Sequence, residues 1–491
     1  MDGGKKHKEY NLESTMLSKP LFLNILRTQL NVEPTQGQES AMIKMADFLY
    51  KKAPNQLFIL KGYAGTGKTT LISALVKVFV NLKKRSVLLA PTGRAAKVFA
   101  SYSGEKAFTI HKHIYKITQK EGLIKVSRRV NESCNTLYIV DEASMISFEK
   151  NQGELFGNRE LLTDLIEYVF EGDNNKLIFI GDDAQLPPVH SDESPALNLD
   201  FLTANFEVEL SSYTLTNVVR QAHYSGILYN ATLLRNILHT QKYQLPFFSL
   251  QSFEDIKRIG SLELEDELNR LFANYETEEI VVVTRSNKRA YIYNNEIRNR
   301  IFCRENKLAT GDFLMAVKNN YYWIDELSEV GFIANGDLIE VTSIKKTQEL
   351  YGFIFMDIQA RLCDYPNHPD VDFKIILESL ESEGASMTSE QMKQLYQEIA
   401  KDYEHISNKR ARFMKIKNNP FLNAVQVKFS YSLTCHKTQG GQWKVVLIDL
   451  GFFKEERIDK EFLRWLYTAV TRATEKVYLI NFDDRFFVKE I

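Results

Sequence analysis

Gly62-Tyr63-Ala64-Gly65-Thr66-Gly67-Lys68-Thr69 directly follows the apolar run Leu57–Leu60 and precedes a helical stretch, an order that predicts a strand, a phosphate-binding loop and a helix. The glycines let backbone N–H groups wrap a phosphate, and the helix N-terminus adds partial positive charge. Lys68 suits a bridge between β- and γ-phosphates, and the Thr69 hydroxyl suits Mg²⁺. We therefore predict an ATP·Mg²⁺ site whose contacts are Gly62, Ala64, Gly65, Thr66, Gly67, Lys68, Thr69 and Thr70.

Similar apolar runs recur on both sides of this loop. In one region they are Leu57–Leu60, Ser86–Pro91, Leu137–Val140 and Lys176–Ile180. A second region repeats the pattern at Ile280–Thr284, Val425–Tyr431, Val445–Leu450 and Lys476–Ile480. Continuous apolar strands that alternate with helices indicate a parallel sheet covered on both faces. The fold class is therefore predicted as α/β with two parallel-sheet domains.

Two insertions interrupt these domains. The interval 304–423 begins with alternating, turn-punctuated segments that predict a small antiparallel barrel. Thr388 and Gln391 then have capping-box spacing at the start of a helix predicted from Ser389 to about His405. A shorter insertion at about 107–135 contains a turn at Glu121-Gly122. The predicted organisation is an N-terminal extension over 1–30, a first domain over 31–212, and a second domain over 213–303 and 424–491.

The overall composition is that of an ordinary globular protein. The chain has 491 residues, 44% of them hydrophobic, and a formal net charge of -1. The four cysteines lack paired spacing, which favours a reducing, cytoplasmic setting, and no apolar run approaches the roughly 18 residues of a membrane span. Because the charges balance, any nucleic-acid surface must be local. One basic cluster fits either an auxiliary strand contact or a solvated helix face: Lys409, Arg410, Arg412, Lys415 and Lys417.

Polar side chains also end two further predicted strands. Asp141 and Glu142 follow Leu137–Val140, where ligands bind at the carboxyl edge of a parallel sheet. We assign Asp141 to the Mg²⁺ shell and Glu142 to orienting and deprotonating the attacking water. Gln185, which follows another strand, carries an uncharged amide that suits sensing of the γ-phosphate.

Seven segments in order carry a family resemblance: GYAGTGKT (62–69), APTGRAAK (90–97), IVDEASM (139–145), GDDAQLPPV (181–189), LTNVVRQ (215–221), TCHKTQGGQW (434–443) and LYTAVTRA (466–473). Together they resemble the motifs of superfamily 1 helicases of the RecD/Dda-like branch, from about Asn31 to Phe482. The resemblance implies two RecA-like domains, a hairpin or wedge in the short insertion and an SH3-like barrel in the long one. It also implies ATP-driven 5′-to-3′ movement on single-stranded DNA.

The same resemblance implies roles for single positions. Gln38, with Thr35, matches an adenine-reading motif, Gly441 falls in the nucleotide site, and Arg220 and Arg472 match arginines that reach the γ-phosphate from the second domain. The implied strand contacts are Thr92, Lys97, His111, Pro188, Val189, Thr434, His436 and Lys437. Implied partners are single-stranded DNA and tailed duplex DNA, with the 304–423 insertion as a candidate surface for protein partners. We place the wedge at the Gln119–Leu123 turn.

Some alternatives stay open at this point. Phe108 and Tyr115 suit base stacking, but they suit a buried core equally well. An RNA-directed helicase of the same superfamily and a nucleotide-dependent binding switch are the rival functions. The switch is disfavoured because all the hydrolytic positions, Glu142 included, are filled.

Overall fold

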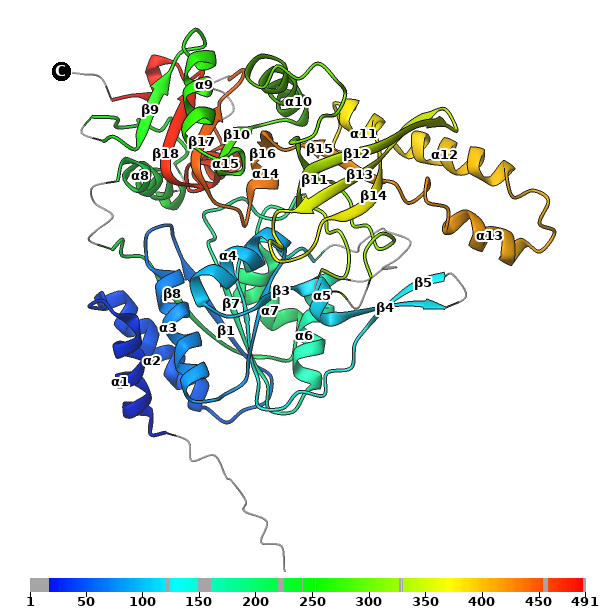
Figure 1. Ribbon diagram of the computed structural model, residues 1–491. Coiled ribbons are helices and arrows are strands. Elements are labelled where there is room, and N and C mark those ends of the chain that lie inside the picture. Colours follow the sequence, from blue (N-terminus) through cyan, green and yellow to red (C-terminus); the bar gives the residue numbers. More distant parts are fainter. Residues whose placement is uncertain are drawn as a thin grey trace, which may run out of the picture.

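Two parallel sheets, one in each half of the molecule, organise the computed structural model (Figure 1). The structure describes residues 17–120, 123–148, 160–189, 191–219, 225–240, 242–251, 253–325, 328, 330–453 and 458–488. Within these residues, no helix is long and apolar enough to cross a membrane.

The first sheet has the strand order β3-β2-β6-β7-β1-β8, and every neighbouring pair is parallel. Its strands are β1 (Gln56–Gly62), β2 (Ser86–Ala90), β3 (Ala107–Thr109), β6 (Leu137–Val140), β7 (Lys176–Gly181) and β8 (Glu209–Leu215). Phe58 and Leu60 face one side, and Leu57 and Ile59 face the other. Both faces are therefore buried, as the continuous apolar runs predict.

Helices cover the two faces of this first sheet. One face packs against α1 (Lys19–Leu30), α2 (Gln36–Tyr50), α3 (Lys68–Asn81) and α4 (Gly93–Ser103). The other packs against α5 (Ile110–Ile114), α6 (Leu161–Glu171) and α7 (Leu199–Asn205). Short 3₁₀ turns lie at Ala143–Met145 and Pro195–Leu197.

The second sheet has the order β16-β10-β17-β18-β9 and is also parallel. Its strands are β9 (Ile256–Ile259), β10 (Ile280–Thr284), β16 (Ser432–Thr434), β17 (Trp443–Asp449) and β18 (Ala473–Ile480). Around it lie α8 (Gly226–Thr240), α9 (Leu264–Asn274), α10 (Asn287–Glu296), a π-helical turn (Ile297–Ile301), α14 (Cys435–Thr438), α15 (Lys460–Val470) and 3₁₀ turns at Thr277–Glu279 and Asp484–Phe486. Tyr63 and Leu186 of the first domain join the apolar cluster formed by α8 and α15, so this apolar cluster spans both domains.

The long insertion forms a closed five-stranded barrel. Its strands are β11 (Phe313–Ala316), β12 (Leu338–Leu350), β13 (Phe353–Leu362), β14 (Val371–Ile376) and β15 (Val425–Phe429). The prediction that Val425–Tyr431 is a strand of the second sheet is wrong, because β15 pairs with β11 and β14. The barrel is also not wholly antiparallel, since β14 and β15 are parallel. The apolar run continues from β15 into β16, so its pattern does not mark where the barrel ends.

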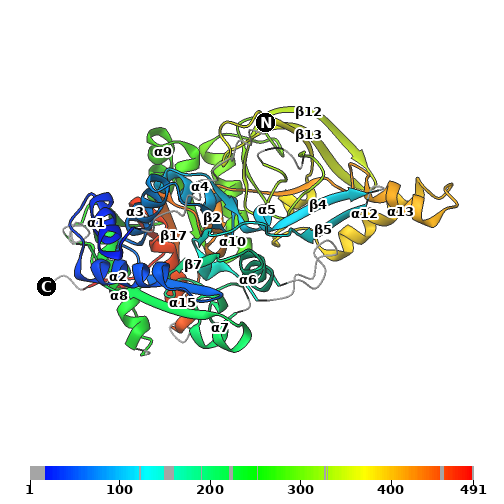
Figure 2. The same cartoon turned by 90° about the horizontal axis from the view of Figure 1, so that it is seen from below.

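Two projections leave the molecule on the same side (Figures 1 and 2). One is a helical arm formed by α11 (Glu378–Glu381), α12 (Ser389–Lys401) and α13 (Lys409–Lys417). The Thr388–Gln391 capping box is present, although α12 ends at Lys401, before the predicted His405. The other is the hairpin of β4 (Tyr115–Lys120) and β5 (Leu123–Arg128), whose turn at Glu121-Gly122 lies outside the described residues. The predicted fold class, two parallel-sheet domains with an inserted hairpin and an inserted barrel with helices, is confirmed.

Candidate nucleotide site and strand-binding surface

The glycine-rich loop lies between β1 and α3 at the carboxyl edge of the first sheet. Gly65 and Gly67 have φ values of +72° and +80°, which favour glycine. A Cβ on Gly67 would lie 2.2 Å from Gln38 Nε2, so the close approach excludes a side chain there. Lys68 Nζ donates to the carbonyls of Gly62 and Tyr63, the latter at 3.1 Å. The loop therefore curls around its own ammonium group, an arrangement that suits an anionic ligand.

Gln38 supports this loop from the start of α2. Its backbone N–H donates to Thr35 Oγ1, and its side-chain Oε1 accepts from the Thr35 N–H at 2.9 Å. Its Nε2 lies 3.4 Å from the Thr66 carbonyl, and the residue is only 2% exposed. Both ends of the amide are thus engaged with protein here. Reading of adenine by Gln38 stays a prediction.

Asp141 and Glu142 follow β6 and face the same edge. Asp141 accepts from the Tyr102 hydroxyl and, at 2.8 Å, from the Glu142 N–H. Glu142 has a φ of +50°, a conformation that costs on the order of 1–3 kcal/mol for a residue with a side chain. Burial raises the pKa of both carboxyl groups, and Lys68 opposes this rise. Such strain and desolvation are typical of functional carboxylates.

The residues at this edge fit a hydrated magnesium ion. Thr69 lies exposed at the start of α3, and Asp141 supplies a carboxylate. Over the described part of the chain, no three His, Cys, Asp or Glu side chains group into a metal site of their own. Mg²⁺ commonly takes one or two protein oxygens and completes its shell with water and substrate phosphates. A hydroxyl with one carboxylate is therefore a sufficient protein contribution.

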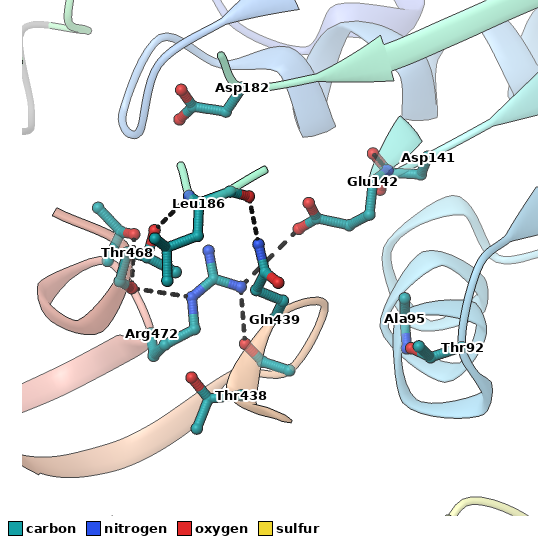
Figure 3. A network of polar contacts seen from close by, with 12 residues as sticks. Thr92, Ala95, Asp141, Glu142, Asp182, Leu186, Thr438, Gln439, Thr468 and Arg472 are labelled. Atoms are coloured by element: carbon teal, nitrogen blue, oxygen red, sulfur yellow. Dashed lines mark hydrogen bonds and ion pairs between the residues drawn. The ribbon is translucent and has the colours of Figure 1, made fainter. Parts of the chain in front are cut away.

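Arg472 reaches this edge from the second domain (Figure 3). Its Nη1 lies 3.9 Å from Glu142 Oε1 and 3.3 Å from the Gly441 carbonyl, and its Nε donates to the Thr468 carbonyl at 3.1 Å. The residue is 4% exposed. The guanidinium lowers the pKa of Glu142, in opposition to the larger effect of burial. A buried cation from one domain thus faces a partly buried carboxylate from the other. The second predicted arginine, Arg220, lies outside the described residues.

The segment after β7 bonds directly to the second domain. The Leu186 N–H donates to Thr468 Oγ1 at 2.9 Å, and Gln439 Nε2 donates to the Leu186 carbonyl at 2.6 Å (Figure 3). The neighbouring Gln185 Oε1 is buried and has no hydrogen-bond partner among the residues that the structure describes. A cavity of about 630 Å³ adjoins it, lined among others by Lys61, Asp182 and Arg464. An unpartnered buried amide oxygen beside a polar cavity suits a group that bonds to a ligand or to water.

Sequence reasoning missed four groups in this interface. Asp182, Gln439, Tyr467 and Thr468 all make hydrogen bonds between the two domains. Each lies inside a segment that carries the family resemblance, which was the available signal. Their chemistry appears only once the two domains are placed together.

The segments APTGRAAK and TCHKTQGGQW also meet across the domains. Arg94 stacks on Trp443 with its guanidinium carbon 3.9 Å from the ring centre, and its Nη2 donates to the Gln442 carbonyl at 3.1 Å. A Cβ on Gly440 would lie 2.8 Å from Ala95 Cβ. Gly441 is equally confined, by Trp443 and Arg94, so packing accounts for its lack of a side chain; a nucleotide contact by Gly441 stays a prediction.

The predicted strand contacts lie in varied environments. Thr92 caps α4 by accepting from the Ala95 N–H, and Lys97 Nζ donates to the Cys363 carbonyl of the barrel at 2.7 Å. Burial lowers the pKa of His111 to about 4, so its imidazole is neutral near pH 7. Pro188 is buried, whereas the remaining positions are partly or fully exposed: Val189, Thr434, His436 and Lys437. Contact of all these residues with nucleic acid stays a prediction.

The structure decides one open alternative. Tyr115 is buried, and its hydroxyl donates to Asp164 Oδ2 at 2.7 Å. Phe108 is half-buried and packs against the same apolar cluster. Tyr115 is thus a core residue, whereas Phe108 is only partly buried.

Two family models match the chain in the order of its two domains. Residues 35–239 match the model described as an AAA domain, and residues 429–480 match the UvrD-like helicase C-terminal domain. The second match contains Thr434, His436, Lys437, Gly441 and Arg472.

Three curated relatives are similar over most of their length. An uncharacterized protein of Acanthamoeba polyphaga mimivirus is 24% identical over 90% of this chain and 98% of that protein. The RecBCD enzyme subunit RecD of Buchnera aphidicola is 24% identical over 89% of this chain and 71% of its own. The ATP-dependent DNA helicase dda of Enterobacteria phage T4 is 25% identical over 64% of this chain and 68% of its own.

Among solved structures, a Bacteroides Pif1 helicase with ADP-AlF3 and ssDNA has a TM-score of 0.47 at 16% identity, covering 94% of this chain and 95% of its own.

Proposed function

Because the chain belongs to the superfamily 1 helicases of the RecD/Dda-like branch, we propose that it is an ATP-dependent DNA helicase that moves 5′-to-3′ on single-stranded DNA. The observation that carries this proposal is Arg472 of the second domain, 3.9 Å from Glu142 at the edge that holds Lys68. Residues from both domains then complete one site for ATP.

The two domains can act as a motor because the nucleotide links them. Lys68 and the loop amides hold the phosphates on one side, and Arg472 adds positive charge from the other as negative charge spreads in the transition state. Glu142 orients and deprotonates the attacking water, and Thr69 with Asp141 would hold Mg²⁺, which supplies charge neutralisation. Loss of the γ-phosphate removes the link, so the domains separate. Alternating grip on the strand then gives directional stepping.

Strand displacement from matched tailed duplexes tests this function. We expect ATP-dependent release of the strand from a DNA duplex with a 5′ single-stranded tail, and little release from its 3′-tailed counterpart. Release only from the 3′-tailed duplex contradicts the polarity. Hydrolysis without any release favours the binding switch. Stronger ATPase stimulation by RNA than by DNA oligomers favours the RNA-directed helicase, since the 2′-hydroxyl is the distinguishing group.

The arm helix α13 provides a test of an auxiliary strand contact. Its nine residues, KRARFMKIK, contain five basic side chains and no acidic one. Among the described residues, Lys409, Arg412 and Lys415 make no ion pair. We expect replacement of all three by alanine to reduce the log–log salt slope of single-strand binding by about 0.7 for each phosphate that the arm no longer neutralises. The control replaces exposed Lys44, Lys52 and Lys77 of the first domain; equal slopes for both variants contradict a role of the arm in strand binding.

A further inference from the structure

The Tyr467 side chain extends from α15 of the second domain to the phosphate-binding loop of the first. Its hydroxyl accepts from the Ala64 N–H at 2.9 Å and donates to Asp182 Oδ2 at 2.7 Å. Asp182 Oδ1 in turn accepts from the Ala184 N–H at 3.0 Å. Tyr467 and Asp182 are each 1% exposed. One hydroxyl thus joins the loop after β1, the loop after β7 and the second domain.

Neighbouring residues of α15 also form hydrogen bonds with the first domain. Arg464 donates to the carbonyls of Asp192, at 2.6 Å, and Asp183, at 3.1 Å, while Thr468 accepts from the Leu186 N–H. Positions three and four apart lie on one face of a helix, so Arg464, Tyr467 and Thr468 present one continuous face to the first domain. Tyr467 is the member of this face that touches the phosphate-binding loop itself.

The same helix sets the position of Arg472. The Arg472 N–H donates to the Ala469 carbonyl, and its Nε donates to the Thr468 carbonyl at 3.1 Å. Displacement of α15 along its axis would therefore carry the guanidinium with it. The Tyr467 hydroxyl opposes such displacement, because its two partners belong to the loop and strand end that build the nucleotide site.

We propose that Tyr467 is a positioning residue that, through its bonds to Ala64 and Asp182, holds Arg472 in register with the phosphate-binding loop when the domains close. This inference rests on the proposed function. Asp182 is buried and Ala64 is partly buried, and both bonds to the Tyr467 hydroxyl are broken if the domains separate. The hydroxyl therefore links the state of the loop to the placement of the arginine. A phenylalanine ring would fill the same space without either bond.

The test compares Tyr467→Phe with the unaltered protein at saturating single-stranded DNA. Because both hydrogen bonds of a buried hydroxyl are removed, we expect kcat for ATP hydrolysis to fall about 10- to 100-fold, with KM for ATP little changed. In an Arg472→Lys background, the same substitution should reduce kcat by much less, because the arginine through which Tyr467 acts is already absent. Asp182→Asn provides a second variant if Tyr467→Phe does not fold, and it should reproduce the loss of kcat.

Tyr431→Phe is a matched control. Tyr431 is also 1% exposed, and its hydroxyl also accepts a backbone N–H, that of Phe313 at 3.2 Å, and donates to a buried aspartate, Asp312 at 2.9 Å. These partners lie at the barrel, away from the cleft. The control should lower the melting temperature without lowering kcat.

Three outcomes overturn the inference while leaving the helicase proposal intact. An unchanged kcat with a lowered melting temperature makes Tyr467 merely structural. A lowered KM with unchanged kcat means that the hydroxyl obstructs nucleotide binding. Equal losses in the Arg472 and Arg472→Lys backgrounds mean that the two residues act independently. Absence of ATP hydrolysis in the unaltered protein instead contradicts the proposed function itself.

Discussion

Replacing Lys68 with alanine is expected to abolish strand-stimulated ATP hydrolysis, with a loss of roughly 10²–10³-fold or more in kcat. Lys68 Nζ lies within the loop, bonded to the Gly62 and Tyr63 carbonyls, where it is positioned for a phosphate. Removal leaves the phosphate charge without its cation. Binding of single-stranded DNA should be largely retained, since the residues proposed to touch the strand lie on other elements.

Two measurements on the same protein samples check this expectation. Steady-state phosphate release with saturating single-stranded DNA reports hydrolysis, and fluorescence anisotropy of a labelled oligonucleotide reports strand binding. The control is Lys77→Ala, which removes the same charge from an exposed position of the same helix, α3. Retained hydrolysis in the Lys68 variant contradicts the assignment of the loop. Equal loss in both variants indicates damage to α3 rather than to the site.

The first sheet could be predicted because its signals are local. Each strand that carries a site residue is a continuous apolar run followed by a polar or glycine-rich loop, as at Leu57–Leu60 and Leu137–Val140. Parallel pairing brings the carboxyl ends of such strands to one edge. Lys68, Asp141 and Glu142 therefore meet at that edge.

Edge strands and the limit of the barrel were harder to predict. β8 reads ELSSYTL and is only half-buried along most of its length, so it shows no apolar run. β9 is four residues long, IKRI, with an exposed centre. β15 belongs to the barrel because it pairs with β11 and β14, and local hydrophobicity does not show which strands will pair.

Contacts between the domains could be anticipated only in part. The family resemblance predicts that Arg472 lies at the nucleotide site, and the distance of 3.9 Å from its Nη1 to Glu142 Oε1 agrees with that position. Tyr467 and Asp182 lie 285 residues apart, and no local pattern connects them. Which buried hydroxyl forms a hydrogen bond between the domains depends on how the two folded domains pack together. The role of Arg220 stays a prediction.

Arg472→Ala should reduce kcat for ATP hydrolysis by about 10³–10⁵-fold, the range typical of an arginine supplied to a transferring phosphoryl group. The side chain is 4% exposed and faces the first domain across the cleft. Its charge is most valuable in the transition state, so KM for ATP should change far less than kcat. Lysine at this position should restore part of the rate, since it supplies charge without the planar fork.

The pH dependence of kcat in Arg472→Ala tests whether Arg472 faces Glu142, which the loss of rate alone does not test. Burial raises the pKa of Glu142, and Arg472 lowers it. Removing the guanidinium must therefore raise the pKa of Glu142 further. A general base acts when it is deprotonated. The acidic limb of the profile of kcat against pH should therefore move to higher pH in Arg472→Ala. The measurement is kcat against pH at saturating ATP and strand, with Glu142→Gln as the control that lacks the limb. An unmoved limb would mean that Arg472 does not face Glu142 in the working enzyme, and that the site is not completed from the second domain.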